Sequence, residues 1–262
     1  MLEEFKHIAI VVIFLISVGS GFYPLLKREK ARAGGGFPLG EAFGAGVFLA
    51  LSLTLMLPAA AGLYAKAFHG VDYPLASAVV ILAFLTLLFI EHWSERLDTH
   101  REAGAVEEGD SPVIAIIMTV MIAIPSFLLG VALGVGESAA SVLTIFIAVV
   151  VHKGSASFAI ALNLVRSRLA DAQAYAIFIA FALMTPLGIL LGEDIHQYLA
   201  GREMVVIKAI VLSLASGTFL FMSTMHGLRR SPLIEGCSRA DGFAAMLTGV
   251  VLTALVRYVL GG

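Results

Sequence analysis

Charged residues are scarce in this sequence. Asp, Glu, Lys and Arg make up 14% of its 262 residues, and hydrophobic residues make up 59%. A soluble globular domain carries about 25% charged residues. With a mean hydropathy of +0.96, the composition excludes a water-soluble protein and predicts a polytopic membrane protein whose first partner is the lipid bilayer.

Cysteine and excess positive charge are also lacking. The one cysteine, Cys237, excludes an intramolecular disulfide framework and a cysteine-based zinc module. The formal net charge of −2 leaves no basic surplus for a nucleic acid. We therefore expect no nucleic-acid partner.

Long apolar runs separated by short polar breaks are abundant. A membrane-spanning helix needs about 20 mostly apolar residues. The runs predict an all-α integral membrane protein of eight transmembrane helices, forming one membrane domain over residues 1–262, with the first helix retained rather than cleaved as a signal peptide. The predicted helices cover about 7–25, 39–61, 74–93, 112–134, 138–163, 173–192, 204–226 and 242–260.

Lys and Arg are concentrated in alternate loops. The loops after the first, third, fifth and seventh predicted helices hold most of them, beginning with Lys27 and Arg28. Basic residues favour the cytoplasmic side of short loops. Because the helix count is even, we expect both termini on the non-cytoplasmic side of a plasma or inner membrane.

One ionisable pair, His152-Lys153, lies deep in an apolar run. Ionisable groups in the hydrocarbon cost about 2.5–3.5 kcal/mol each on insertion scales and are usually functional. A neutral imidazole can bind a transition metal, whereas an ammonium group repels one. Ser155 shares the helical face of His152. We interpret this pair as functional, against the alternative of a structural histidine.

Other polar residues mark the predicted helix ends. Glu91 and Glu95 stand four residues apart around His92, a spacing and composition that suit a divalent cation. A solvated helix end is the competing interpretation, as it is for His226. Glu193 and Asp194 lie just outside the sixth predicted helix, where a charged loop is the competing interpretation. These residues are peripheral metal candidates only.

Four segments resemble one family, the ZIP (Zrt/Irt-like) metal transporters. In chain order they read GVFLA followed by MLP (46–50 and 56–58), VHKG (151–154), MTPLG (184–188) and SGTFLF (216–221). The resemblance implies eight helices with both termini outside, a homodimer, and transport of zinc, iron or manganese toward the cytoplasm. It makes the divalent metal, with zinc the first candidate, a substrate and implies no prosthetic group.

Departures from the family pattern fall at its metal ligands. The fourth helix of the family carries a His and a Glu one turn apart, where this chain has Pro125 and Leu129. Leu55 and His226 replace two further ligands, so His152 is the central ligand that remains. Metal sites usually need three or four protein ligands. We therefore expect a degenerate central site, in which Ser126, Met56, Thr185 and carbonyls freed by Pro125 and Pro186 take over part of the role.

The sequence leaves three candidate functions. The first is a ZIP-like divalent metal transporter. The second is a non-transporting or repurposed protein of the same fold, acting as a regulator or dimer partner. The third, an intramembrane zinc hydrolase, is disfavoured because His152 is the one deep histidine and the sequence has no HExxH motif. The expectation is a transporter and not an enzyme.

Overall fold

Helices account for every element in the computed structural model, which describes residues 2–32, 38–101, 112–136, 139–195, 201–226 and 240–261. In chain order they are α1 (Leu2–Leu26), α2 (Arg28–Arg32), α3 (Pro38–Ala50), the π-helical segment η1 (Leu51–Met56), α4 (Leu57–Ala67), α5 (Leu75–Arg101), α6 (Pro112–Gly134), α7 (Ala139–Arg166), α8 (Asp171–Ile195), α9 (Arg202–Phe221), the π-helical segment η3 (Met222–His226) and α10 (Ala240–Gly261). The all-α architecture expected from the sequence is confirmed.

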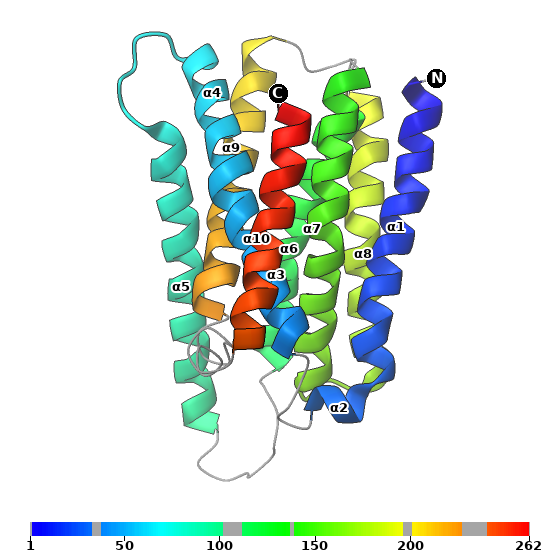
Figure 1. The fold of residues 1–262 in the computed structure, drawn as a ribbon. Helices are drawn as coiled ribbons and strands as arrows, with labels where there is room; N and C mark the ends of the chain where they lie inside the picture. Colours follow the sequence, from blue (N-terminus) through cyan, green and yellow to red (C-terminus); the bar gives the residue numbers. More distant parts are fainter. Residues whose placement is uncertain are drawn as a thin grey trace.

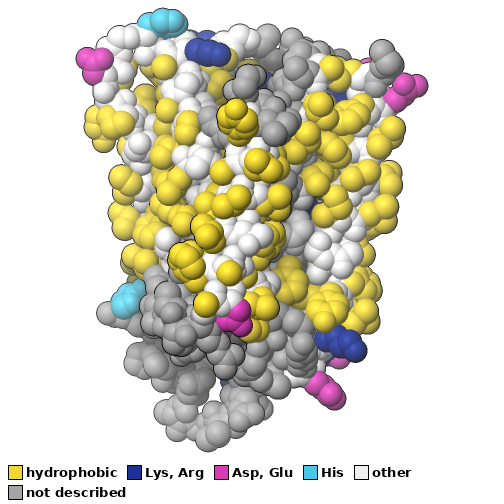
Figure 2. Space-filling view, in the orientation of Figure 1, with side chains coloured by type: hydrophobic (Ala, Val, Ile, Leu, Met, Phe, Trp, Pro, Cys, Tyr) yellow, Lys and Arg dark blue, Asp and Glu magenta, His cyan; other side chains and the backbone are white. Residues whose placement is uncertain are grey.

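The long helices are apolar enough to cross a membrane. Within the described residues, six helical stretches have the required length and hydropathy, and Leu75–Ile90 and Ala240–Val256 are shorter apolar stretches. Hydrophobic side chains cover the middle of the face in Figure 2, and charged side chains gather toward its two ends. The N and C termini lie at the same end of the bundle, opposite α2 (Figure 1). This is the arrangement of a multi-pass membrane protein.

Helix ends differ from the predicted ones mainly where a helix leaves the apolar zone. The predicted helix at 112–134 coincides with α6, but α5 continues to Arg101 instead of ending at 93. Residues 94–101 include Glu, Arg and Leu, which are good helix formers. Polar residues therefore mark where the apolar stretch ends, while the helix itself continues into the polar segment between the predicted helices 74–93 and 112–134.

The tightest helix crossing joins α6 to α8 through glycines on both sides. A Cβ added to Gly130 would meet the Thr185 carbonyl oxygen at 2.3 Å, and one added to Gly188 would meet the Phe127 carbonyl oxygen at 2.1 Å. Gly134 and Gly192 repeat the contact one turn further along. Small residues allow membrane helices to approach to backbone contact. The crossing fixes α6 against α8 along the length that holds Pro125 and Pro186.

Polar contacts tie the helices together at both ends of the bundle. Near the N terminus, buried Lys6 of α1 donates a hydrogen bond to the carbonyl oxygen of Gly134, the last residue of α6. At the opposite end Arg166 of α7 makes a two-pronged ion pair with Glu41 of α3, with nitrogen–oxygen distances of 2.8 and 3.1 Å. Arg28 pairs with Asp171 at the same end. Each contact joins helices far apart in sequence.

Candidate functional site

Helix α7 carries the central candidate residues. It packs against α1, α3, α6 and α8, and His152 and Lys153 are its two middle residues. Their side chains are 1% and 0% exposed. Surrounded by helices on several sides, both groups lie in the interior of the bundle rather than on its lipid-facing surface.

His152 lies toward α9. Its ring is 5.3 Å from the ring of Phe219, with the two planes tilted by 57°. Phe219 also contacts Phe48 of α3, at a ring separation of 5.0 Å. The imidazole therefore lies beside an aromatic pair that joins α3 and α9, the helices that carry two of the family-like segments.

Lys153 lies toward α8 instead. Its Nζ is 4.1 Å from the centre of the Phe181 ring, a cation–π geometry. Among the described residues, no hydrogen-bond acceptor is within reach of this Nζ. When protonated, this buried amine makes the neighbourhood of His152 unfavourable for a second cation.

Ser126 and Thr185 meet where α6 crosses α8. The Thr185 hydroxyl donates to the Ser126 carbonyl oxygen at 3.1 Å, and both residues are 1% exposed. Thr185 is one turn after Phe181, the aromatic partner of Lys153. Within the described part of the chain, the Ser126 hydroxyl has no hydrogen-bond partner. The oxygen of this hydroxyl is a potential ligand for a cation in the interior of the bundle.

Met56 and Ser155 contact other parts of the bundle. Met56 is buried at the end of the π-helical segment η1, and half-buried Ser155 faces Gly44 of α3. Segment η1 is fixed to α9 by Ser52 and Ser216, whose hydroxyls each donate to the other's carbonyl oxygen, at 2.8 and 3.1 Å. π-Helical turns inside α-helices are frequent at functional sites.

The structure does not gather the candidate residues around one point. Ser126 and Thr185 are in contact, Lys153 contacts Phe181 one turn before Thr185 on α8, and His152 lies beside Phe219 of α9. In the described residues, no group of three His, Cys, Asp or Glu side chains could hold a metal ion. Leu129, which stands where the family has a Glu, is 7% exposed and apolar.

The peripheral candidates Glu91, His92 and Glu95 were expected at a helix end, but they lie within α5, because that helix continues to Arg101. His92 is exposed on α5, and the side chains of Glu91, Glu95 and His226 lie outside the described part of the structure. Glu193 is half-buried and Asp194 exposed in the last turn of α8. A metal-binding role for these residues stays a prediction.

Several functional features were missed from the sequence. Phe181 and Phe219 are far from α7 in the chain, so no local pattern connects them to Lys153 and His152. The π-helical segments also have no sequence signature that we could use. Lys6 was also missed, because it precedes the predicted helix at 7–25, whereas α1 begins at Leu2 and includes it.

Comparison with known proteins gives one consistent result. A family model described as ZIP Zinc transporter matches residues 93–257. Zinc transporter ZIP3 of Bos taurus is 26% identical over 229 residues, covering 69% of this chain and 73% of the relative. Zinc transporter ZIP1 of Mus musculus is 26% identical over 265 residues, covering 85% and 81%. Zinc transporter ZIP2 of Mus musculus is 24% identical over 203 residues, covering 67% and 66%. Because the family model matches more than half of its residues, this chain belongs to the ZIP zinc transporter family.

Proposed function

We propose that the protein transports a divalent metal ion, with zinc as the first candidate, across its membrane toward the cytoplasm. The observation that supports this most is the family match over 165 of its 262 residues, which includes the helix carrying His152. Fold membership alone supports activity only by analogy. His152 adds a ligand of the right type in the middle of the bundle.

The orientation is part of the proposal. The bundle end that holds α2 carries Lys27, Arg28 and Arg166, whereas the termini lie at the opposite end. Basic residues favour the cytoplasm. We infer eight membrane crossings, with both termini outside and α2 inside, and a homodimer as the working assembly.

The central site is degenerate in this proposal. His152 contributes nitrogen, while Ser126, Thr185 and Met56 offer weaker oxygen and sulfur ligands. When protonated, Lys153 adds a positive charge next to His152 along the same helix. We therefore expect weak metal affinity, and a protein that moves ions and catalyses no reaction.

Reconstituted liposomes test the proposal. We would follow uptake of zinc, manganese, iron and cadmium by the purified protein and by His152→Ala. His7→Ala is the matched control, because His7 is an exposed histidine of α1. We expect uptake that falls at least tenfold in His152→Ala and is unchanged in His7→Ala. Equal uptake by all three proteins would refute a role for His152.

A second candidate is a ZIP-fold protein that no longer transports and acts as a regulator or dimer partner. Two observations favour it: apolar Leu129 at the position of a family ligand, and buried Lys153. Folded, reconstituted protein that takes up none of the four metals would favour this second candidate.

A further inference from the structure

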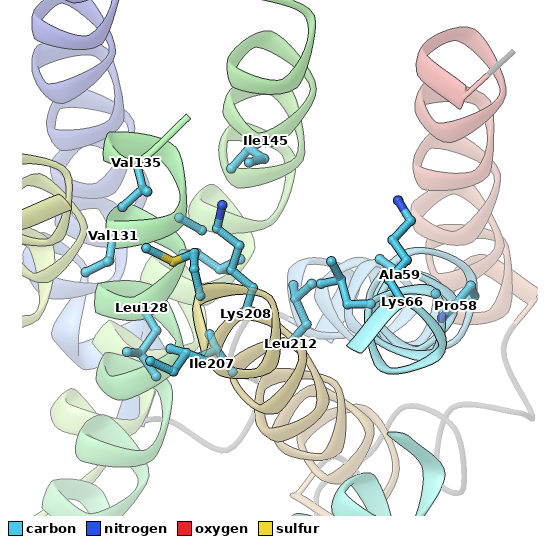
Figure 3. A pocket seen from close by; sticks show the side chains of 16 residues that line it. Pro58, Ala59, Lys66, Leu128, Val131, Val135, Ile145, Ile207, Lys208 and Leu212 are labelled. Atoms are coloured by element: carbon cyan, nitrogen blue, oxygen red, sulfur yellow. The ribbon is translucent and has the colours of Figure 1, made fainter. Parts of the chain in front are cut away.

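A cavity borders the central site on one side of His152. It lies between α4, α6, α7 and α9 and includes Leu129, so it belongs to the central site itself. Ile145, its lining residue on α7, comes seven residues before His152, nearer the bundle end that holds the termini. Figure 3 shows Lys208 of α9 extending toward Ile145. An ion that reaches His152 from this cavity still needs a passage toward the end that holds α2.

The face of α7 that carries His152 continues toward α2. At spacings of three or four residues, the positions that share this face are Ser155, Ala159, Asn163 and Arg166. The first three are half-buried and have small or polar side chains. At about 1.5 Å per residue, the face runs about 21 Å from His152 to Arg166, which is the last residue of α7. An ion that moves along this face meets small and oxygen-bearing side chains before it reaches Arg166.

Helix α3 covers this face of α7. A Cβ added to Gly44 would lie 3.7 Å from the Cβ of Ser155. A Cβ added to Gly40, one turn nearer α2, would lie 2.9 Å from the Phe158 ring. Small residues allow membrane helices to approach closely. The two glycines therefore let α3 close over the α7 face.

An ion pair closes the end of this contact that is nearest α2 (Figure 1). Two nitrogens of Arg166 donate to the two carboxylate oxygens of Glu41, at 2.8 and 3.1 Å. We call the whole contact the α3–α7 seam, made of Gly40, Glu41 and Gly44 on α3 and Ser155, Phe158 and Arg166 on α7. Glu41 is the one acidic residue of the seam, and Arg166 neutralises it.

We propose that the transported ion leaves the central site along the α3–α7 seam, and that Glu41 is a cation site on this route, held by Arg166 while the seam is closed. This inference rests on the proposed function and adds the route by which the ion leaves. Carboxylate oxygen is a ligand for divalent metal ions such as zinc and manganese. Glu41 supplies the anionic oxygen that the neutral serine, threonine and methionine candidates of the central site do not.

The guanidinium group of Arg166 stands where the ion would bind. Both are positively charged, and a carboxylate can bind either one through its two oxygens. When the seam opens, Arg166 releases Glu41 and keeps the carbonyl oxygen of Ala31 as an acceptor, at 3.2 Å in the closed arrangement. The ion then takes the place of Arg166 on Glu41, and it leaves when Arg166 returns. Stable metal sites use several protein ligands, so a single carboxylate holds the ion weakly enough to let it pass.

A disulfide across the seam tests the route. The Cβ separation of 3.7 Å between positions 44 and 155 falls within the range of about 3.5–4.5 Å found in disulfides. In a Cys237→Ser background, Gly44→Cys with Ser155→Cys is oxidised in liposomes, and zinc uptake is followed before and after reduction. We expect oxidation to lower uptake at least tenfold and reduction to restore it. Undiminished uptake with the disulfide formed would overturn the route.

A second disulfide is the matched control. Ser17 of α1 and Ser157 of α7 are both buried, with their hydroxyl oxygens 3.1 Å apart. Ser17→Cys with Ser157→Cys in the same background ties α7 to α1 instead of α3. Its oxidation should leave uptake unchanged, and neither reagent should affect proteins with one cysteine of the seam pair. An equal loss of uptake with both disulfides would show that α7 needs general freedom, and would contradict a specific role of the seam.

Cadmium binding tests Glu41 without transport. Equilibrium dialysis of the purified full chain compares the wild type with Arg166→Gln, with Arg166→Gln plus Glu41→Gln, and with Arg28→Gln. We expect Arg166→Gln to bind cadmium at least fivefold more tightly than the wild type, because Glu41 loses its partner, and the double variant to bind as the wild type does. Arg28→Gln, which releases Asp171 in the other ion pair at this end, should gain no affinity. Equal binding by all four proteins, or an equal gain in Arg28→Gln, would contradict a cation site at Glu41.

Failure of the route can be distinguished from failure of transport. If the wild type takes up no metal, transport and its route both fail, and the cadmium measurement still decides whether Glu41 binds a cation. If the wild type takes up metal but the seam disulfide has no effect, transport stands and the route is wrong. The seam disulfide removes no charge, so it remains a test if a charge variant does not fold.

Discussion

Two opposing free-energy contributions act on the Lys153 side chain. A charged lysine at membrane depth costs about 2.5–3.5 kcal/mol, whereas a cation–π contact such as that with Phe181 returns about 0.5–2 kcal/mol. The cost is larger, so Lys153→Met should raise the melting temperature of the purified protein by several degrees. Lys27→Met, at an exposed position, is the control. A lower melting temperature for Lys153→Met would show that the ammonium group stabilises the bundle.

The same substitution should change metal handling. At an effective dielectric constant of about 20, two unit charges 4 Å apart interact by about 4 kcal/mol, so even a more distant ammonium group opposes a divalent ion on His152. We expect Lys153→Met to lower the KM for zinc uptake about tenfold, equivalent to about 1.4 kcal/mol. A KM that is unchanged or higher would argue that Lys153 takes part in transport.

The burial of a single residue was predictable where it depends only on the position of the residue along an apolar helix. The central placement of His152 and Lys153 followed from counting along one apolar run, and the structure buries both. Their aromatic partners were not predictable, because Phe219 and Phe181 reach them only through the packing of α9 and α8 against α7. Whether these residues serve a metal stays a prediction.

At the scale of elements, the crossing of α6 and α8 depends on the absence of side chains at its glycines. An alanine at Gly188 would bring its Cβ to 2.1 Å from the Phe127 carbonyl oxygen and force the helices apart. Overpacking costs about 1–3 kcal/mol, so Gly188→Ala should lower the melting temperature in detergent. Gly19→Ala, in the open on α1, should leave it unchanged or raise it slightly. Equal melting temperatures for the two variants would contradict the close crossing.

A second element-scale prediction concerns Arg166. Its guanidinium group bridges α7 to Glu41 of α3, and its Nε donates to the Ala31 carbonyl oxygen of α2, at 3.2 Å. Lysine keeps the charge but cannot make the two-pronged contact. Because the two side chains are 14% and 22% exposed, we expect Arg166→Lys to cost about 1–2 kcal/mol. Chemical denaturation of the purified protein measures this, and a loss below a few tenths would contradict it.

Helix ends and π-helical turns set the limit of prediction at this scale. Apolar runs located the long helices, but α5 continues to Arg101 because polar residues with high helix propensity extend it beyond the membrane. The π-helical segment η1 arises where α3 leads into α4 beside the Ser52–Ser216 contact. That contact joins residues far apart in sequence, so local patterns do not reveal it.

For the whole molecule, the common position of the two termini makes sidedness testable. In a Cys237→Ser background, a cysteine at Asp72, between α4 and α5, lies at the end of the bundle that holds the termini, and a cysteine at Glu29 of α2 lies at the other end. If the basic end is cytoplasmic, a membrane-impermeant maleimide should label Asp72→Cys on intact cells. Glu29→Cys should react only after permeabilisation. The reverse pattern would invert the molecule, placing both termini on the cytoplasmic side and α2 outside.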